Sequence, residues 1–475
     1  MDGNIPGNGG SGRSSFQKIT DAFLGQAGLP FASVLSSERI ERVFAKHGCD
    51  FGRNGIYSAA LVLWSFLSQV LRDGKEASCQ AAVARITAHQ QQSGGCTPTA
   101  DTGNYCRGRA KLSEAALREL TTEVAAETEQ QAPAAWLWKG RHAKLVDGFT
   151  FTMPDTAANQ AGYPQHSEQR PGVGFPIARA TAILSLATAC VMNLALGPIR
   201  GKETGETALF RALLGSLDAG DIVVADRYYC SYLMIALLLQ RGVDVCFRVH
   251  QLRHTDFRRG RRLGHDDHLI VWSKPPRPEW IDQETYDALP AQLELRELRY
   301  PITTPGRRTD GITVVTTLKD PATYTATEVA DLFGFRWNVE LDLRAIKQNL
   351  NLVHVRCKSP EMVHRELWTT LLAYNLIRTT AAAAAVLHEK QPREIGFTAV
   401  CQYVLSSWSQ FSTTCCAPAE LERRCRELLR CISGCRVAHR PDRVEPRVLK
   451  RRRHGYTLMT EPRPTLRARL KRHNP

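Results

Sequence analysis

Hydrophobic residues recur three and four positions apart through the first quarter of the chain. The pattern is clearest in SSERIERVFAKHG, SAALVLWSFLSQVLRDG and SEAALRELTTEVAAETEQQ. This spacing places the apolar side chains on one face of an α-helix, so we predict an all-helical domain over residues 16–135. The Gly- and Ser-rich segment before it, residues 1–15, predicts a disordered N-terminus.

The pattern changes to that of strands after QQAPAAWLWKG, which we interpret as a linker. Short apolar or alternating runs follow, namely AKLVDGFTFTM, ARATAILSLATACVMNLAL, DIVVAD and VDVCFRV, with the helical patterns GETALFRALLGSL and SYLMIALLLQRG between them. Strands that alternate with helices predict an α/β fold, in which helices flank a mixed, partly parallel sheet. We place this domain at residues 140–390.

A polar, basic and Pro-rich stretch interrupts this domain at about residues 251–320. Its LELREL and ITVVTTL runs predict that the insertion is mostly β. Helical periodicity returns at Thr325, where Thr325 and Glu328 fit a capping box, and we predict one helix that continues towards Leu350.

The C-terminal part of the chain is predicted to be helical and then strongly basic. A long helix is expected over residues 361–388, and a helical region with a basic tail over residues 391–475. The whole chain carries a net charge of +15, and the segment from Arg436 to Pro475 holds thirteen basic against three acidic residues, a net +10. Basic excess in one segment indicates a polyanionic partner such as nucleic acid, although a solvated tail would have the same composition.

The longest apolar runs do not predict a membrane span. YLMIALLLQ is too short, and ATAILSLATACVMNLALGPI contains polar residues and ends in Gly-Pro. The N-terminus lacks the pattern of a signal peptide, and the 14 cysteines include no Cys-x-x-Cys pair. We therefore expect a cytoplasmic protein with no membrane partner.

Two segments of the helical domain could form a helix-turn-helix. A Gly-containing turn separates these segments, SCQAAVARITAHQQQ and TADTGNYCRGRAKL. The second helix would offer Arg107, Arg109 and Lys111 to DNA. Two packed helices without any DNA contact would show the same pattern, so the sequence leaves both interpretations open.

A stripe of charge runs along the helix in FGFRWNVELDLRAIKQNL. With about 100° per residue, Phe333, Arg336, Arg344 and Lys347 fall within roughly 40° of Glu340, beside the apolar stripe. That position suits the wall of a cleft, where a carboxylate can lie between cations. An ordinary amphipathic helix with one Arg336–Glu340 pair is the alternative.

Two further carboxylates change the balance between these interpretations. Asp226 ends the apolar run DIVVAD, and ligands gather at the carboxyl ends of parallel strands. Asp147 lies inside the strand pattern KLVDG, where a charge is costly unless it is paired or bound to a metal. Together with Glu340 they would form an all-oxygen site, which suits Mg²⁺ or, in its place, Mn²⁺. Two such ions can catalyse the hydrolysis of a phosphodiester, while Arg336 and Lys347 bind its phosphates.

With these residues in view, the chain resembles bacterial DDE transposases of the insertion-sequence-4 family from about Lys144 to Thr380. The signature of that family is Tyr, two residues, Arg, three, Glu, six, Lys. The same spacing occurs here as Phe333, Arg336, Glu340 and Lys347. The stretches VDGF, VADRYY, PDTAANQAGYPQ, GKETGE and DFRRGRRLG also look like the family.

The resemblance implies a ribonuclease-H-like catalytic domain with a β-rich insertion before the glutamate. It implies Asp147, Asp226 and Glu340 as catalytic metal ligands, and places Arg227 and the residue at position 333 at the DNA. We also expect Arg344, on the same charged stripe, to contact DNA. Phe333 lacks the hydroxyl with which the family's Tyr is thought to bind phosphate. Some relatives pass through a DNA hairpin with a flipped base stacked on an aromatic side chain, and Trp272 and Trp280 are the candidates here.

We therefore expect an insertion-sequence transposase that binds terminal inverted repeats and carries out cut-and-paste transposition on double-stranded DNA. The resemblance further implies a homodimer on DNA and a protein associated with the bacterial nucleoid. Two alternatives stay open on the sequence alone. One is a related nuclease that cuts without joining, and the other is a catalytically impaired or domesticated DNA-binding protein, for which Phe333 is the only hint.

Overall fold

The computed structural model describes residues 34–51, 56–92, 98–301, 311–413, 418–437 and 457–473. The segment predicted to be disordered, residues 1–15, lies outside the described residues, as does the stretch 438–456 of the basic tail. The helices before the sheet are α2 (Ser37–Lys46), α3 (Ala59–Val70), α4 (Cys79–Gln92), α5 (Gly103–Lys111) and α6 (Glu114–Gln130).

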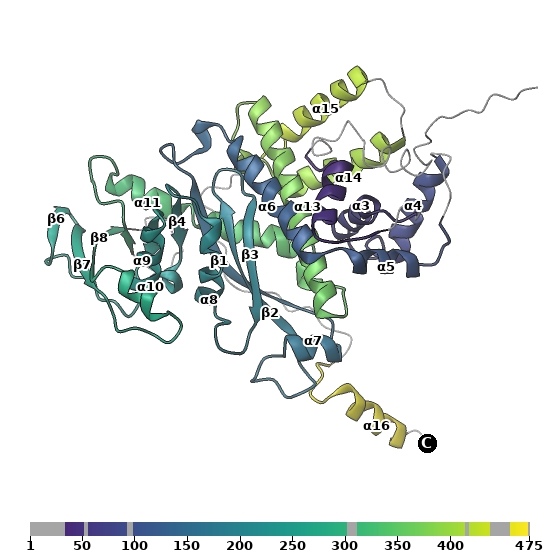
Figure 1. Cartoon of the computed structure of the whole chain (residues 1–475), viewed down its shortest axis with the longest axis horizontal. Coiled ribbons are helices and arrows are strands. Elements are labelled where there is room, and N and C mark those ends of the chain that lie inside the picture. The colour runs from purple at the N-terminus through teal and green to yellow at the C-terminus, as the bar shows by residue number, and fades with distance from the viewer. Residues whose placement is uncertain are drawn as a thin grey trace, which may run out of the picture.

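One nine-stranded mixed sheet forms the centre of the molecule, in the order β3-β2-β1-β4-β5-β9-β8-β7-β6 (Figure 1). Strands β1 and β4 pair in parallel, as do β4 and β5, and all other neighbours are antiparallel. The strands are β1 (Ala143–Thr152), β2 (Ile177–Ser185), β3 (Val191–Pro198), β4 (Ile222–Ala225), β5 (Asp244–Arg248), β6 (Arg261–Gly264), β7 (Asp267–Ser273), β8 (Gln292–Pro301) and β9 (Gly311–Thr316).

The segment β3-β2-β1-β4-β5 has the strand order and directions of a ribonuclease-H-like sheet, and helices lie on both of its faces. The predicted fold class is thus confirmed. Strand β4 explains why the apolar run DIVVAD was informative: Ile222 and Val224 join the core on one face of the sheet, while Val223 and Ala225 join the core on the other. A strand that is buried on both faces has no solvent-facing position for a polar residue.

The insertion extends the same sheet instead of forming a separate layer, because β9 pairs with β5. Its centre is held by a buried ion pair, in which Arg296 bonds Asp267 through Nε at 2.8 Å and through Nη2 at 2.5 Å. The remaining short helices of this half are α7 (Ala157–Gly162), α8 (Glu206–Arg211), α9 (Tyr232–Gln240) and α10 (Gln283–Ala288).

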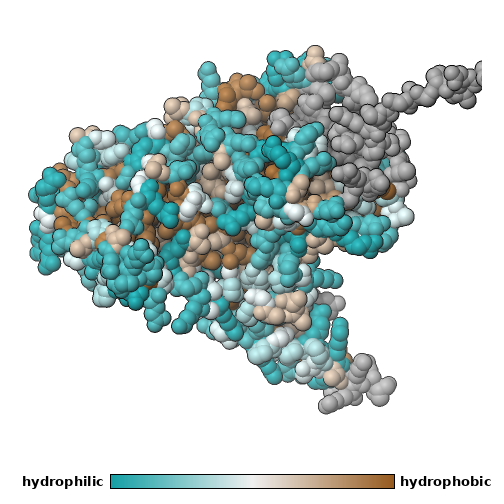
Figure 2. All heavy atoms as spheres, in the orientation of Figure 1, coloured by the Kyte–Doolittle hydropathy of each residue, from teal (hydrophilic) through white to brown (hydrophobic). Residues whose placement is uncertain are grey.

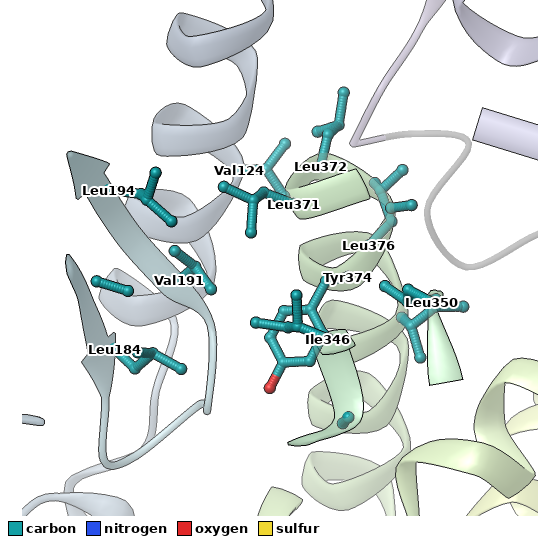
Figure 3. Close-up of a cluster of buried hydrophobic side chains, with 14 of the residues drawn as sticks. Val124, Leu184, Val191, Leu194, Ile346, Leu350, Leu371, Leu372, Tyr374 and Leu376 are labelled. Carbon is teal, nitrogen blue, oxygen red and sulfur yellow. The ribbon is translucent and has the colours of Figure 1, made fainter. Parts of the chain in front are cut away.

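The long helix α13 (Pro360–Leu387) lies between the helical N-terminal part and the sheet. Figure 3 shows Leu371, Tyr374 and their neighbours on this helix facing Val124 of α6 and the hydrophobic side chains of β2 and β3. Of the described helices, α13 alone has the length and apolar composition to cross a membrane, but 78% of its apolar window is buried inside the molecule. It serves as the central core helix that joins the two halves.

The helix predicted from Thr325 to Leu350 is divided into three parts. Thr325 caps α11 (Ala326–Gly334) with the predicted capping box, α12 (Trp337–Arg344) follows, and a π-helical turn spans Ala345–Asn349. The prediction of one unbroken helix was wrong. Around Arg336 the backbone N–H groups bond to the carbonyl three residues earlier instead of four, which ends the regular α-helix. Periodicity alone cannot show such a change of helical step.

Beyond the sheet follow α14 (Phe397–Thr413), α15 (Pro418–Ser433) and α16 (Arg463–His473). Helices α14 and α15 pack on α13, whereas α16 projects from the body of the molecule near α7 (Figure 1). Figure 2 shows hydrophilic side chains over most of this face of the molecule, and hydrophobic ones gathered near its middle.

Candidate active site

The two predicted aspartates lie side by side at the centre of the sheet. Val146 of β1 is the register partner of Ala225 of β4, so Asp147 and Asp226 are the next residues on two adjacent parallel strands. Strand neighbours lie about 4.8 Å apart. Because side chains alternate along a strand, Asp147 emerges on the same face as Leu145, the face that α12 covers.

The helix α12 brings Glu340 and Arg336 to this position. Nη2 of Arg336 lies 2.7 Å from Oε1 of Glu340, and its Nη1 lies 3.6 Å from Oδ2 of Asp147. The guanidinium thus lies between a carboxylate of the sheet and a carboxylate of the helix. This contact supports the cleft-wall interpretation of the charged stripe over the ordinary amphipathic helix.

A buried carboxylate that the sequence analysis did not single out fixes the orientation of α12. Asp342 accepts hydrogen bonds at 2.8 Å from Arg378 of α13 and from Arg393, and its side chain is 2% exposed. Arg393 also donates to the backbone carbonyl of Ser185 at the end of β2. Asp342 lies two residues from Glu340, about 200° around the helix, so this clamp anchors α12 from the side opposite to Glu340.

The environment of Asp147 disfavours its negative charge. Burial raises the pKa of Asp147 to about 6, and the nearby carboxylates of Glu206 and Glu340 act in the same direction. The backbone N–H of Gly148, which donates to Oδ1 at 2.8 Å, and the guanidinium of Arg336 oppose this shift. A carboxylate with a raised pKa at the end of a parallel sheet is typical of a functional site.

The donors at this site are carboxylate oxygens, the ligand type that Mg²⁺ and Mn²⁺ prefer, so the residues fit the predicted metals. Within the described part of the chain, no three His, Cys, Asp or Glu side chains lie close enough together to hold a metal ion as they stand. Arg336 accounts for this at Asp147 and Glu340, because its guanidinium lies between them.

Glu206 is a fourth carboxylate near the site, and sequence reasoning missed it. It begins α8, and a methyl group at Gly148 would lie 2.3 Å from its Cδ, so its side chain occupies the space that the missing side chain of Gly148 leaves. Burial and the charge of Asp226 raise the pKa of Glu206. The signals in the sequence were the Gly148 that follows the aspartate in VDGF and the family-like stretch GKETGE, which ends at Glu206.

Three predicted phosphate-binding residues lie at the surface around the site. Lys347 is half-buried on the π-helical turn, and Arg344 is exposed at the end of α12. Arg227 follows Asp226 directly, donates through Nη1 to Gln251 at 2.8 Å and is partly exposed. Their positions are compatible with contacts to a DNA backbone.

Phe333 does not belong to this surface. Its ring is 4% exposed and packs in the core with Leu332 and Val329 of the same helix, so it cannot contact a phosphate in this conformation. The helical wheel placed it beside Glu340 because it assumed one regular helix up to Leu350. The change of helical step at Arg336 invalidates that assumption.

Only two of the three basic residues predicted to contact DNA from helix α5 are exposed to solvent. Arg107 and Lys111 are exposed, but Arg109 is 9% exposed and its guanidinium stacks on the rings of Phe66 and Tyr105. The prediction of DNA contact for Arg109 is therefore wrong. Its side chain holds α5 against α3 instead.

The two tryptophans of the insertion differ in accessibility. Trp272 is 3% exposed, its indole N–H donates to Glu297 at 3.0 Å, and Arg253 lies 3.5 Å above its ring, so this structure leaves no face free for a base. Trp280 is partly exposed beneath Arg211 and lines an open cavity of about 770 Å³. Tyr228, two residues from Asp226, lines the same cavity.

Comparison with known proteins agrees with the class that this fold and site define. Residues 138–376, just over half of the chain, match the family model of the transposase DDE domain, and the chain belongs to this family of transposases. The chain is also 24% identical over 353 residues to the transposase InsG for insertion sequence element IS4 of Escherichia coli strain K12. The match covers 74% of this chain and 76% of that protein.

Among solved structures, a piggyBac transposase synaptic complex with hairpin DNA is similar over 87% of this chain and 85% of that chain, with a TM-score of 0.42 and 8% identity. The match to the family model and the similarity to InsG confirm the resemblance to IS4-type DDE transposases.

Proposed function

We propose that the protein is the transposase of an insertion sequence, which binds the terminal inverted repeats of its element, cleaves the DNA there and transfers the freed 3′ ends to target DNA. The observation that carries this proposal is the juxtaposition of Asp147 and Asp226 on adjacent parallel strands with Arg336 and Glu340 of α12 across from them. Membership of the DDE transposase family supports it.

The carboxylates Asp147, Asp226 and Glu340 would hold Mg²⁺ or Mn²⁺. When bound, such ions activate the attacking oxygen and stabilise the leaving oxygen of a phosphodiester. In the structure Arg336 contacts both Asp147 and Glu340, and on release from either carboxylate its planar fork can bind a phosphate bidentately. Lys347, Arg344 and Arg227 would bind the adjoining phosphates as surface charges.

Other DNA contacts follow from exposed groups. The cavity lined by Tyr228 and Trp280 would receive the DNA strand next to the scissile bond, with Trp280 as the aromatic side chain on which a base can stack. Arg107 and Lys111 of α5 would contact the inverted repeat. We further propose, from the family resemblance, that the protein acts as a homodimer on DNA in the bacterial cytoplasm, which light scattering with and without end DNA would measure.

The decisive experiment uses labelled DNA fragments that carry the ends of the element, taken from the genomic DNA around the gene. With Mg²⁺, the wild-type protein should nick these ends and join them to a target plasmid, and Glu340→Ala should lose at least 100-fold in rate because a charged ligand is removed. Asp331→Ala is the matched control, since it removes an exposed carboxylate from the neighbouring helix α11.

The outcomes separate the remaining alternatives. Cutting without any joined product would identify a nuclease, and tight binding without metal-dependent cutting would identify a noncatalytic DNA-binding protein. Wild-type cleavage by Glu340→Ala would refute the proposed site. The hint for the noncatalytic alternative is weaker than the sequence suggested, because Phe333 lies in the core and not at the DNA-binding surface.

A further inference from the structure

Glu206 is a partly buried acid without an evident counterion. Its carboxylate makes no hydrogen bond or ion pair with another described side chain, and Arg179, the cation that lowers its pKa, donates to the carbonyl of Thr204 instead. Burying a carboxylate is costly unless a cation or several donors compensate it. The structure therefore leaves a partly buried carboxylate that Arg179 influences at a distance but that no ion pair among the described residues neutralises.

The position of Glu206 is fixed by the backbone of the catalytic strand. Its Cδ fills the space beside Gly148, where a methyl group would lie 2.3 Å away, and the backbone carbonyl of Glu206 accepts a hydrogen bond from the hydroxyl of Thr181 at 3.3 Å. Gly148 follows Asp147 and points to the opposite face of the sheet. Glu206 thus approaches the aspartates from the face opposite to Glu340.

A second observation points to a ligand at the same place. Tyr229 is 1% exposed, and its hydroxyl has no well-formed hydrogen bond with any described residue, although Thr181 is near. The hydroxyl lies within the electrostatic field of Glu206, Asp147 and Asp226. A buried hydroxyl without a hydrogen bond is expected to have a partner, such as a water molecule of a hydrated cation.

We propose that Glu206 is a fourth carboxylate of the metal site and approaches the divalent cation of Asp147 and Asp226 from the α8 side of the sheet. This inference rests on the proposed function, since it assumes that the aspartates bind metal. It also explains why Gly148 must follow Asp147: any side chain at position 148 would displace the Glu206 carboxylate.

Binding of Mn²⁺ to the purified full-length protein without DNA tests the inference. We expect Glu206→Gln to lower the Mn²⁺ affinity 10- to 100-fold in a calorimetric titration, the range typical for loss of a supporting group at a metal site. Mn²⁺ should also raise the melting temperature of Glu206→Gln less than that of the wild type. Glu279→Gln is the control, because the Glu279 side chain is 96% exposed and its contact with Lys202, at 3.8 Å, lies at the surface.

A second pair of variants tests the role of Gly148 independently. Gly148→Ala should weaken Mn²⁺ binding because its methyl group displaces the Glu206 carboxylate. In the Glu206→Ala background, where that carboxylate is absent, the same Gly148→Ala change should have little further effect. Equal losses in both backgrounds would mean that Gly148→Ala acts on Asp147 directly and would overturn the link to Glu206.

The failure of this inference can be distinguished from the failure of the proposed function. If Glu206→Gln binds Mn²⁺ like the wild type while Asp226→Asn does not, the inference is wrong and the site of Asp147, Asp226 and Glu340 stands. If the wild type and Asp226→Asn both bind no Mn²⁺, the proposed metal site and the inference fall together.

Discussion

Neutralising Asp147, a proposed metal ligand, should stabilise the protein while it abolishes the proposed DNA cleavage. The change is Asp147→Asn, which keeps the size of the side chain and can still accept the hydrogen bond from the Gly148 N–H. Asp147 lies near Glu206 and Glu340, and burial raises its pKa to about 6 from an ordinary value of 3.8. The folded protein therefore binds the proton of Asp147 more tightly than the unfolded chain does.

The sign and size of the effect follow from this difference. A raised pKa destabilises the folded state once the carboxyl group ionises, so the penalty is absent below pH 3.8, grows between pH 3.8 and 6, and is complete above pH 6. At 1.36 kcal/mol per pH unit, the full penalty is about 3 kcal/mol. Because the side chain is partly exposed and Arg336 loses one partner in the variant, we expect a gain of about 1–3 kcal/mol.

Urea denaturation of the wild type and Asp147→Asn at a series of pH values measures this gain. The difference in unfolding free energy should be near its maximum at pH 7.5 and should shrink towards zero as the pH falls to 4. Glu279→Gln provides the comparison for loss of an exposed carboxylate, and it should change little at any pH. An Asp147→Asn variant that is less stable than the wild type at pH 7.5 would refute the electrostatic reasoning.

Four other changes test separate parts of the structure. Asp342→Ala leaves Arg378 and Arg393 without their buried partner and should lower the unfolding free energy by about 3–5 kcal/mol in urea; a loss below 1 kcal/mol would contradict the clamp. Burial would raise the pKa of the Glu129 carboxyl group. The hydrogen bond from His142 and the charge of Lys144 outweigh burial and lower this pKa to about 2. Glu129→Gln should therefore cost about 3 kcal/mol at pH 7, and less as the pH falls from 4.5 towards 2, in the same titration. Phe333→Tyr buries a hydroxyl, so it should lower stability by about 1–3 kcal/mol and leave DNA affinity in a filter-binding assay unchanged; tighter binding would place residue 333 at the DNA. Deletion of residues 457–475 removes five basic and one acidic side chain, so nonspecific DNA affinity should fall and its dependence on salt should become shallower; an unchanged slope would mean that α16 does not touch DNA.

The sequence predicted the sheet well because its strands carry their own signals. The unbroken apolar run before Asp226 requires burial on both faces, and that requirement alone places β4 at the centre and Asp226 at its carboxyl end. The adjacency of Asp147 and Asp226 also follows, once both strands are taken as parallel neighbours. These inferences depend on local patterns, which a single sequence contains.

The parts that could not be predicted depend on contacts between distant segments. Arg109 is a basic residue on a helix that could bind DNA, so its sequence context suggests a DNA contact. Only the packing of α5 on Phe66 shows that Arg109 is buried. The burial of Trp272 could not be predicted either, because Arg253, which stacks on its ring, comes from a loop before the strand. Glu206 is the last residue of the family-like stretch GKETGE, and its relation to Gly148 exists only in three dimensions.

Four carboxylates lie around the ends of β1 and β4, and their repulsion explains why α12 needs the buried ion pairs of Asp342 to hold it in place. Asp147, Asp226, Glu206 and Glu340 repel one another, and Arg336 is the cation that contacts two of them directly. Without another constraint, a helix of eight residues with an irregular start and a π-helical end could move its carboxylate away from the sheet. Asp342 prevents this through Arg378 and Arg393, and both pairs lie below the surface, where screening by salt is weak. The repulsion is therefore stored in the folded state instead of relaxing, and transfer of Arg336 to a phosphate would leave Asp147 and Glu340 free to share a divalent cation.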